Sequence, residues 1–191
     1  FSGTGNTKHC VETFVREFEL AGKNFSIEAE NTVREICAHN EIVIGYPVQF
    51  SNLPKILRDF VVDNSSIWKG KRVFVIATMG LFSGDGAGLL ARLLAGYGAF
   101  ITGGLHLKMP DSIGDERALK RTLEQNRKLV RAAEEKIQKA AWKIRNGRPP
   151  QDGIGLLKHL TGLFGQRIYF RGKTKEYSDK FIWIELGLQT S

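Results

Sequence analysis

The chain begins with Phe1-Ser-Gly-Thr-Gly-Asn-Thr7, which places two glycines, three hydroxylated residues and an asparagine within seven positions. An amphipathic helix is predicted to follow directly, because apolar residues recur at helical spacing at Val11, Phe14, Val15 and Phe18. If a strand ends at Phe1, the amides of residues 3–7 converge at the positive end of that helix, where the hydroxyl groups join them. The stretch therefore predicts a phosphate site, with a plain strand-to-helix turn as the alternative.

Two common phosphate motifs do not describe this loop. It lacks the Gly-Lys-Ser/Thr ending of a P-loop, and it lacks the third glycine of the dinucleotide-binding turn. No acidic residue is suitably placed on a second strand either. A loop rich in hydroxyl groups instead suits the terminal phosphate monoester of a permanently bound small molecule.

Strands and helices are predicted to alternate along the chain. Strands are expected at residues 25–30, 41–45, 72–78 and 99–109, the first of them the weakest and the last kinked at Gly103 and Gly104. Helices are expected at residues 7–20, 55–62, 89–97 and 116–146, and Gly147-Arg-Pro-Pro150 ends the last one. Its apolar stripe recurs every seven residues at Leu123, Val130, Ile137 and Ile144. This alternation predicts an α/β fold with a parallel sheet covered on both faces.

Two more loops follow predicted strands. They are Tyr46-Pro-Val-Gln-Phe-Ser-Asn52 and Met79-Gly-Leu-Phe-Ser-Gly-Asp-Gly86, and each sets aromatic side chains beside small polar residues. Ligands of parallel sheets bind beyond the carboxyl ends of the strands, where these loops and the opening loop are expected to meet. Any one of the aromatic residues could be an ordinary loop anchor, but the three loops together predict a site for a flat, partly polar ring.

At these loops the sequence resembles a known family. The stretch Ser2-Gly-Thr-Gly-Asn-Thr7 resembles the FMN phosphate loop of flavodoxins. The segments 41–48, 52–54, 77–80 and 84–86 resemble the flavin-ring loops of the flavodoxin–ferredoxin fusion family, in which a flavodoxin domain precedes a two-cluster ferredoxin domain. The resemblance covers residues 1–180 and includes the linker 162–166. It implies a flavodoxin-like three-layer sandwich with a central parallel five-stranded sheet.

The resemblance also implies FMN as a non-covalent cofactor whose isoalloxazine ring carries one or two electrons. The residues expected to hold its phosphate are Ser2, Gly3, Thr4, Gly5, Asn6 and Thr7. Those expected to border one side of the ring are Tyr46, Pro47, Val48 and Asn52, and those expected to border the other are Thr78, Met79, Gly80, Phe82 and Asp85. No catalytic residue and no metal ligand is expected. The histidines are interpreted as surface or packing residues: His9, His39, His106 and His159.

The sequence departs from the fusion family at both ends. The strand that should precede Ser2 is largely missing, so we expect an N-terminally truncated FMN-binding domain at residues 1–150. No cysteine follows Cys37, so residues 151–191 are expected to be a basic linker and C-terminal extension leading to an absent ferredoxin domain. Cys10 and Cys37 are predicted to be small buried thiols, with a disulfide or redox pair as the alternative.

The formal net charge is +8, and much of the excess lies in the last third of the chain. A solvated helix face with a basic tail explains it, and such a surface would steer an acidic redox partner such as a ferredoxin. The sequence contains no nucleic-acid-binding motif, so nucleic acid is not expected as a partner. It contains no apolar run long enough to span a membrane, and a cytoplasmic location is expected. The oligomeric state is left open.

Three functions are compatible with the sequence. The leading hypothesis is an FMN-binding electron carrier rather than a stand-alone oxidoreductase. The second is an FMN-dependent NAD(P)H:acceptor reductase that acts on a quinone or another small acceptor. The third is a cofactor-free basic scaffold that binds nucleic acid or a membrane surface, for which steeply salt-dependent binding without flavin would be the sign.

Overall fold

A three-stranded parallel sheet forms the centre of the computed structural model, which describes residues 2–18, 24–49, 52–80, 86–110 and 121–154. Its strands are β1 (Glu41–Pro47), β2 (Arg72–Met79) and β3 (Phe100–Lys108), and β2 lies between the other two. The predicted parallel α/β architecture is confirmed, and the described residues contain three of the expected five strands.

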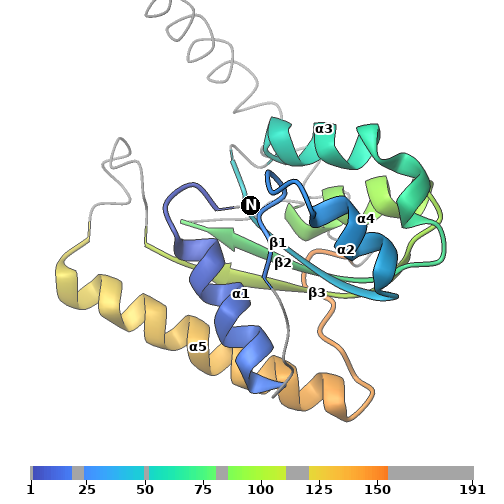
Figure 1. Cartoon of the computed structure of the whole chain (residues 1–191). Coiled ribbons are helices and arrows are strands. Elements are labelled where there is room, and N and C mark those ends of the chain that lie inside the picture. Colours follow the sequence, from blue (N-terminus) through green and yellow to red (C-terminus); the bar gives the residue numbers. More distant parts are fainter. Residues whose placement is uncertain (1, 19–23, 50–51, 81–85, 111–120, 155–191) are drawn as a thin grey trace, which may run out of the picture.

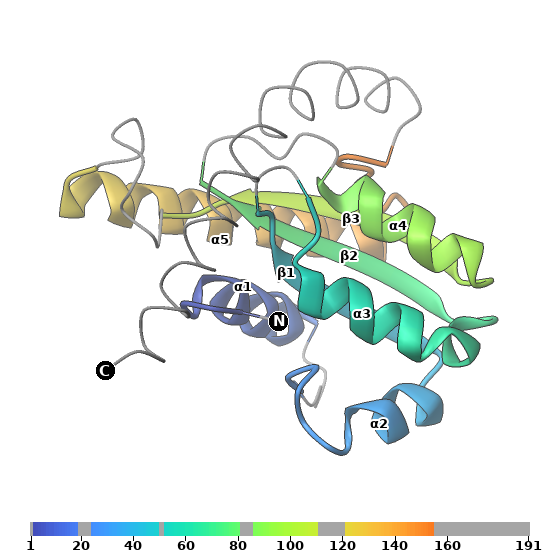
Figure 2. The same ribbon diagram turned by 90° about the horizontal axis from the view of Figure 1, so that it is seen from above.

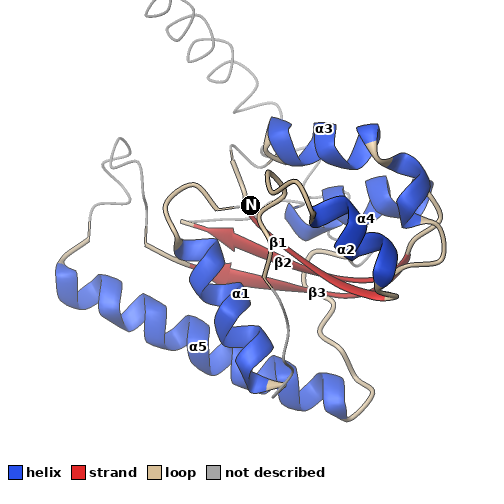
Figure 3. Ribbon diagram, viewed as in Figure 1, coloured by secondary structure: helices blue, strands red, loops and turns tan. Residues whose placement is uncertain are grey.

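Helices cover both faces of the sheet. On one face lie α1 (Asn6–Glu17) and α5 (Leu123–Arg145), and on the other lie α3 (Lys55–Asp63) and α4 (Gly86–Gly96) (Figure 1, Figure 2). The short helix α2 (Thr32–Ala38) and the 3-10 turn η1 (Ser65–Trp68) pack with the second layer. The layered arrangement of helices and strands is also clear in Figure 3. The structure is therefore a three-layer sandwich.

The central strand β2 is apolar on both faces, as a doubly covered parallel strand must be. Val73 and Val75 belong to the core beneath α3 and α4, whereas Phe74 and Ile76 belong to the core beneath α1 and α5. Phe14 of α1 stacks on Phe74 with ring centroids 5.2 Å apart. Each core is thus a continuous apolar layer between the sheet and one helix pair.

A register shift in β3 confirms the kink predicted near Gly103. Ile101 pairs with Val73 and Gly103 pairs with Phe74, so Thr102 is an extra residue in β3. Because of the extra residue, side chains after the shift point to the opposite face of the sheet from that expected by simple alternation. Ile101 packs on the α4 side, and Leu105 packs on the α1 side. A Cβ on Gly103 would lie 2.6 Å from the Pro150 carbonyl oxygen, so only glycine fits at this bend.

The predicted strand at residues 25–30 is wrong. This segment forms turns in which the amide of Ala29 donates to the carbonyl of Ser26 at 3.0 Å, and Thr32 Oγ1 donates to the same carbonyl at 2.6 Å. Local hydrogen bonds of this kind compete with a strand ladder. The next helix, α2, was not predicted, and Lys71 Nζ caps its end by donating to the carbonyls of Cys37 and His39.

Two predicted helix starts are also corrected. Helix α5 begins at Leu123 rather than at residue 116, because Thr122 and Gln125 form a reciprocal capping box. Leu123 is 66% exposed, so it does not belong to the buried part of the apolar stripe. Helix α4 begins at Gly86, three residues before the predicted position, and residues 81–85 and 116–120 lie outside the described part of the chain.

The cysteine prediction is half right. Cys10 is fully buried in α1, but Cys37 is exposed in α2, and both are free thiols. The apolar pattern around Cys10 places it in the core, whereas Cys37 lies on a short helix that presents one face to solvent.

Candidate functional site

The opening loop leads into the first turn of α1. Gly5 is the residue before the helix and has φ 91°, a left-handed conformation that glycine adopts without strain. Its amide donates to Ser2 Oγ at 3.1 Å, and no side chain caps the helix. A Cβ on Gly3 or Gly5 would meet no atom within 4 Å. The loop thus offers a helix N-terminus with open space above it.

Thr7 connects the opening loop to the end of the central strand. Its side chain is buried, and its Oγ1 lies 2.7 Å from Oγ1 of Thr78 in β2. Beside it, Asn6 Nδ2 donates to the carbonyl of Pro110 at 2.9 Å, in the segment after β3. The start of α1 is therefore fixed against two strand ends.

The second loop also attaches to Thr78. The amide of Val48 donates to the Thr78 carbonyl at 2.8 Å, while Gln49 and Asn52 exchange backbone hydrogen bonds of 3.1 and 2.8 Å. Asn52 Oδ1 accepts from the Leu53 amide at 2.9 Å and its residue is exposed. Pro47 and Val48 are half-buried, so this loop presents apolar and amide groups at the carboxyl edge of the sheet.

Tyr46 lies below the loops rather than on their surface. It is fully buried, and its hydroxyl donates to the carbonyl of Gly86, the first residue of α4. The sequence pointed to Tyr46 as an aromatic residue in a loop, whereas the structure makes it a link between β1 and the end of the third loop. Its partner Gly86 could not be recognised from the sequence, because the bond joins residues forty positions apart.

The third loop begins at the end of β2. Thr78 and Met79 are buried and Gly80 is half-buried, and the Met79 carbonyl accepts from the Met109 amide at 2.8 Å. Phe82 and Asp85 lie outside the described residues. Of the predicted site residues that the structure describes, all lie on segments at the carboxyl edge of the sheet, and Thr7, Val48 and Thr78 are joined there by hydrogen bonds.

A fourth segment at this edge was missed by the sequence analysis. Met109 and Pro110 come directly after β3 and bond to Met79 and Asn6 respectively, so they support two of the three loops. Their position in the sequence could have indicated this role, because they directly follow the third parallel strand and therefore lie at the same edge of the sheet. Over the described ranges, no group of three or more His, Cys, Asp or Glu residues is arranged to hold a metal ion.

The electrostatics of the edge favour an anion at α1. The first turn of α1 contains no acidic residue, so the partial positive charge of the helix N-terminus is not offset by a side chain there. Lys8 in the same turn pairs with Glu12 at 3.9 Å and is exposed. Among the described helices, none is long and apolar enough to span a lipid bilayer.

Comparison with known proteins gives a structural answer only. No protein-family model matches the sequence, and no curated protein does. Among solved structures, the two-electron reduced flavodoxin of Megasphaera elsdenii aligns with a TM-score of 0.50 and 21% identity, covering 71% of this chain and 95% of that protein. A flavodoxin from the domain Archaea aligns with a TM-score of 0.53 and 16% identity over 76% of this chain and 94% of its own.

A third solved structure is similar. The Fusobacterium nucleatum flavodoxin bound to flavin mononucleotide aligns with a TM-score of 0.52 and 16% identity, covering 76% of this chain and 93% of that one. At these identities the likeness concerns the arrangement of helices and strands. Together with the parallel sheet and the helices on both of its faces, it shows that this chain has a flavodoxin-like α/β fold.

Proposed function

We propose that the protein is an FMN-binding electron-transfer protein of the flavodoxin type. The observation that carries the proposal is the meeting of three loops at one strand end: Thr78 bonds to Thr7 through its hydroxyl and to Val48 through its carbonyl. This places a helix N-terminus beside two loops that leave adjacent parallel strands, which is where ligands of such sheets bind.

The opening loop fits the phosphate of FMN. A phosphate dianion at α1 would meet the N-terminal amides of an uncapped helix, together with the hydroxyl groups of Ser2 and Thr4. The open space above Gly3 and Gly5 admits a phosphate group. Asn6 and Thr7 would complete the residues that bind the phosphate. Thr7 would support the loop from its buried side, because its hydroxyl is hydrogen-bonded to Thr78.

The other two loops would border the flavin ring. Pro47, Val48 and Asn52 would lie on one side, and Met79, Gly80, Phe82 and Asp85 on the other. Tyr46 and Thr78 would support these loops from the buried side. Bound FMN supplies the one- and two-electron chemistry, while this chain's residues position it and limit the access of water.

The chain would be the flavin half of a flavodoxin–ferredoxin fusion type of protein, with residues 1–150 as the FMN domain and 151–191 as a basic linker. Its excess of positive charge would favour an acidic redox partner such as a ferredoxin.

A flavin titration tests the proposal. FMN fluorescence and visible absorbance would be followed as protein is added, with riboflavin as the phosphate-free control. We expect FMN to bind at least about a hundredfold more tightly than riboflavin, because charge-assisted hydrogen bonds to a phosphate are strong. The double variant Ser2→Ala, Thr4→Ala should weaken FMN and leave riboflavin unchanged, while Ser66→Ala, an exposed serine of η1, serves as the matched control.

Two outcomes would contradict it. Equal affinity for FMN and riboflavin would exclude a phosphate site in the opening loop. Sustained oxidation of NAD(P)H by the FMN-loaded protein with a quinone would assign a reductase rather than an electron carrier.

A further inference from the structure

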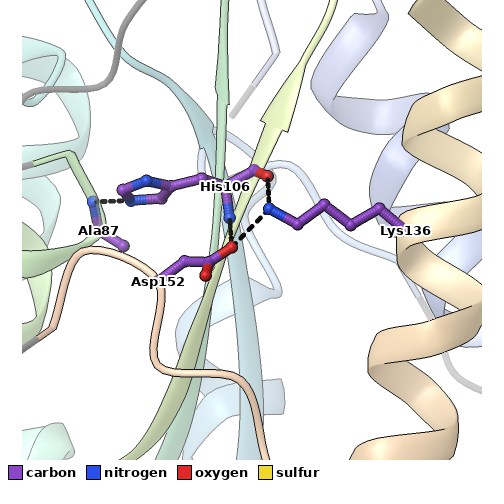
Figure 4. A network of polar contacts seen from close by, with 4 residues as sticks. All are labelled: Ala87, His106, Lys136 and Asp152. Atoms are coloured by element: carbon purple, nitrogen blue, oxygen red, sulfur yellow. Dashed lines mark hydrogen bonds and ion pairs between the residues drawn. The ribbon is translucent and has the colours of Figure 1, made fainter.

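His106 lies on β3 opposite Ala77 of β2 and is half-buried. Its ring points toward the start of α4, where Nε2 lies 3.2 Å from the backbone nitrogen of Ala87 (Figure 4). A backbone amide can only donate, so Nε2 is the acceptor. Ala87 is the second residue of α4 and comes directly after Gly86, where the third loop ends.

The imidazole ring is held in place by the chain that returns after α5. A Cβ on Gly153 would lie 2.4 Å from Nε2 and 2.5 Å from Cε1 of His106, and Gly153 has φ 76°. Only glycine allows the backbone to lie this close to the ring. The ring is therefore enclosed between the start of α4 and residues 152–154.

The main chain of His106 is fixed independently of its ring. Asp152 Oδ2 accepts from the His106 amide at 3.2 Å and from Lys136 Nζ at 2.6 Å, and the same ammonium donates to the His106 carbonyl at 2.8 Å (Figure 4). Burial would raise the pKa of Asp152, but hydrogen bonds from Lys136 and His106, the charge of Lys136 and that of a protonated His106 lower it below its ordinary value. A change of the imidazole ring thus leaves this strand anchored.

The bond to Ala87 requires a neutral imidazole. Protonation would place an N–H on Nε2, facing the Ala87 N–H at the positive end of α4, so the contact would be lost. Among the described residues, the charged groups near His106 are Asp152 and Lys136, which bond to its main chain, and Lys108 on the same strand. The carboxylate of Asp152 favours a protonated imidazole, whereas the two ammonium groups disfavour it. The pairing partner of His106 in β2, Ala77, carries no charge.

We propose that His106 is a positioning residue for the first turn of α4 beside the candidate flavin site, and that it acts only in its neutral form. His106 fixes the amide of Ala87, while the hydroxyl of Tyr46 holds the neighbouring Gly86, so both side chains position the start of α4. Flavin affinity is then linked to the protonation of a group that does not touch the flavin. This inference rests on the proposed function, because the third loop borders the ring in that proposal.

The test compares two substitutions over a range of pH. His106→Gln keeps an acceptor that can reach Ala87, whereas His106→Leu removes it. At about pH 8, we expect His106→Leu to weaken FMN binding about fivefold and His106→Gln to retain wild-type affinity, as the loss of one hydrogen bond predicts. Wild-type affinity should fall at acidic pH, where Nε2 is protonated, and it should fall by more than in either variant. The pH dependence that remains in the variants comes from the FMN phosphate, which gains a proton near about pH 6.

Two controls keep the result interpretable. His39→Gln changes an exposed histidine at the end of α2, so it should retain the wild-type pH profile. Circular dichroism and thermal melting check that each variant is folded. Identical FMN affinities and pH profiles for wild type and His106→Leu would overturn the inference.

A second measurement separates this inference from the proposed function. Hydrogen exchange at the Ala87 amide is followed in the flavin-free protein, where it should speed up in His106→Leu and, for wild type, at acidic pH beyond the intrinsic pH dependence of exchange. If the wild type binds no FMN, the proposed function fails and the exchange result alone decides the role of His106. Unchanged exchange at Ala87 under both conditions would show that His106 does not fix the start of α4.

Discussion

Glycines at single positions decide how closely the layers of this protein approach. A Cβ on Gly45 of β1 would lie 2.3 Å from Cγ2 of Val11, so α1 can pack on β1 only where this side chain is absent. On β3, a Cβ on Gly104 would lie 2.7 Å from the Asp152 carbonyl oxygen. Both glycines lie within predicted strands. Glycine weakens a strand, and its presence there often marks a place where another part of the protein approaches closely. The partner of each approach is distant in the chain and was not predictable.

The two thiols should differ sharply in reactivity. Burial, together with the nearby carboxylate of Glu134, raises the pKa of Cys10 to about 12, whereas Cys37 is exposed. Thiolate is the reactive form, so at about pH 8 only about one part in ten thousand of Cys10 would be reactive even without steric protection. We expect an aromatic disulfide reagent to titrate one thiol rapidly in the native protein and a second only after unfolding.

The variant Cys37→Ser provides the control for this assignment. This substitution should remove the rapid reaction of the native protein and leave the thiol that reacts only after unfolding. Two rapidly reacting thiols in the native protein would contradict the burial of Cys10.

At the scale of elements, the segment after α5 covers the outer edge of β3. The Gly104 amide donates to the Pro150 carbonyl at 2.8 Å, and the Asp152 amide donates to the Gly104 carbonyl at 2.9 Å. An unprotected edge strand is open to pairing with other chains, and this return segment occupies part of that edge. Sequence analysis predicted the end of α5 correctly at Gly147 and expected a C-terminal extension from residue 151. The structure shows that the first residues of this extension bond to β3 through Gly104.

Asp152→Asn should loosen this segment in a pH-dependent way. The folded-state pKa of Asp152 is lowered, so its stabilising effect is present above the unfolded pKa of about 3.9 and is lost as pH falls through the folded value. At about pH 7, we expect a loss of about 1 kcal/mol in the free energy of unfolding, because Lys136 is partly solvent-screened. Urea unfolding of both proteins at several pH values measures the difference.

The matched control is Asp63→Asn, which alters an exposed carboxylate at the end of α3. It should change the free energy of unfolding by less than about 0.5 kcal/mol. A difference between Asp152→Asn and wild type that persists undiminished below about pH 3 would contradict an ionised Asp152 as the source.

At the scale of the whole molecule, the sheet and its two helix layers position both the candidate site and the basic surface. The sheet order and the two helix layers bring the opening loop and the ends of β1 and β2 to one edge. The outward face of α5 exposes basic residues: Lys128, Arg131, Lys139 and Lys143. The positive charge expected in the last third of the chain is thus partly a solvated helix face, as the sequence analysis predicted.

The net charge of +8 predicts how a redox partner should associate, if the proposed function holds. The rate of electron transfer from the FMN-loaded protein to an acidic ferredoxin should fall several-fold as salt is raised from about 50 mM to about 500 mM, because screening weakens long-range attraction. Stopped-flow absorbance measures it. A basic acceptor such as a cytochrome c is the control and should show the opposite trend; a salt-independent rate with the ferredoxin would contradict steering by charge.

The sequence by itself determined the fold class and most of the helices and strands, and it predicted loops whose described residues lie at the carboxyl edge of the sheet. These depend on apolar periodicity, glycine and proline positions and hydroxyl-rich loops, all of which are local properties of the chain. It failed at residues 25–30 and at the start of α5, where side-chain hydrogen bonds of Thr32 and Thr122 decided the outcome.

Only the tertiary structure decided that Tyr46 is buried under the loops, that Thr78 joins two of them, and that His106 meets Ala87 and Gly153. These contacts join residues far apart in the chain, and their geometry depends on how the layers pack. Local sequence preferences carry no information about such distances, so the contacts exist only once the sheet and helices have assembled.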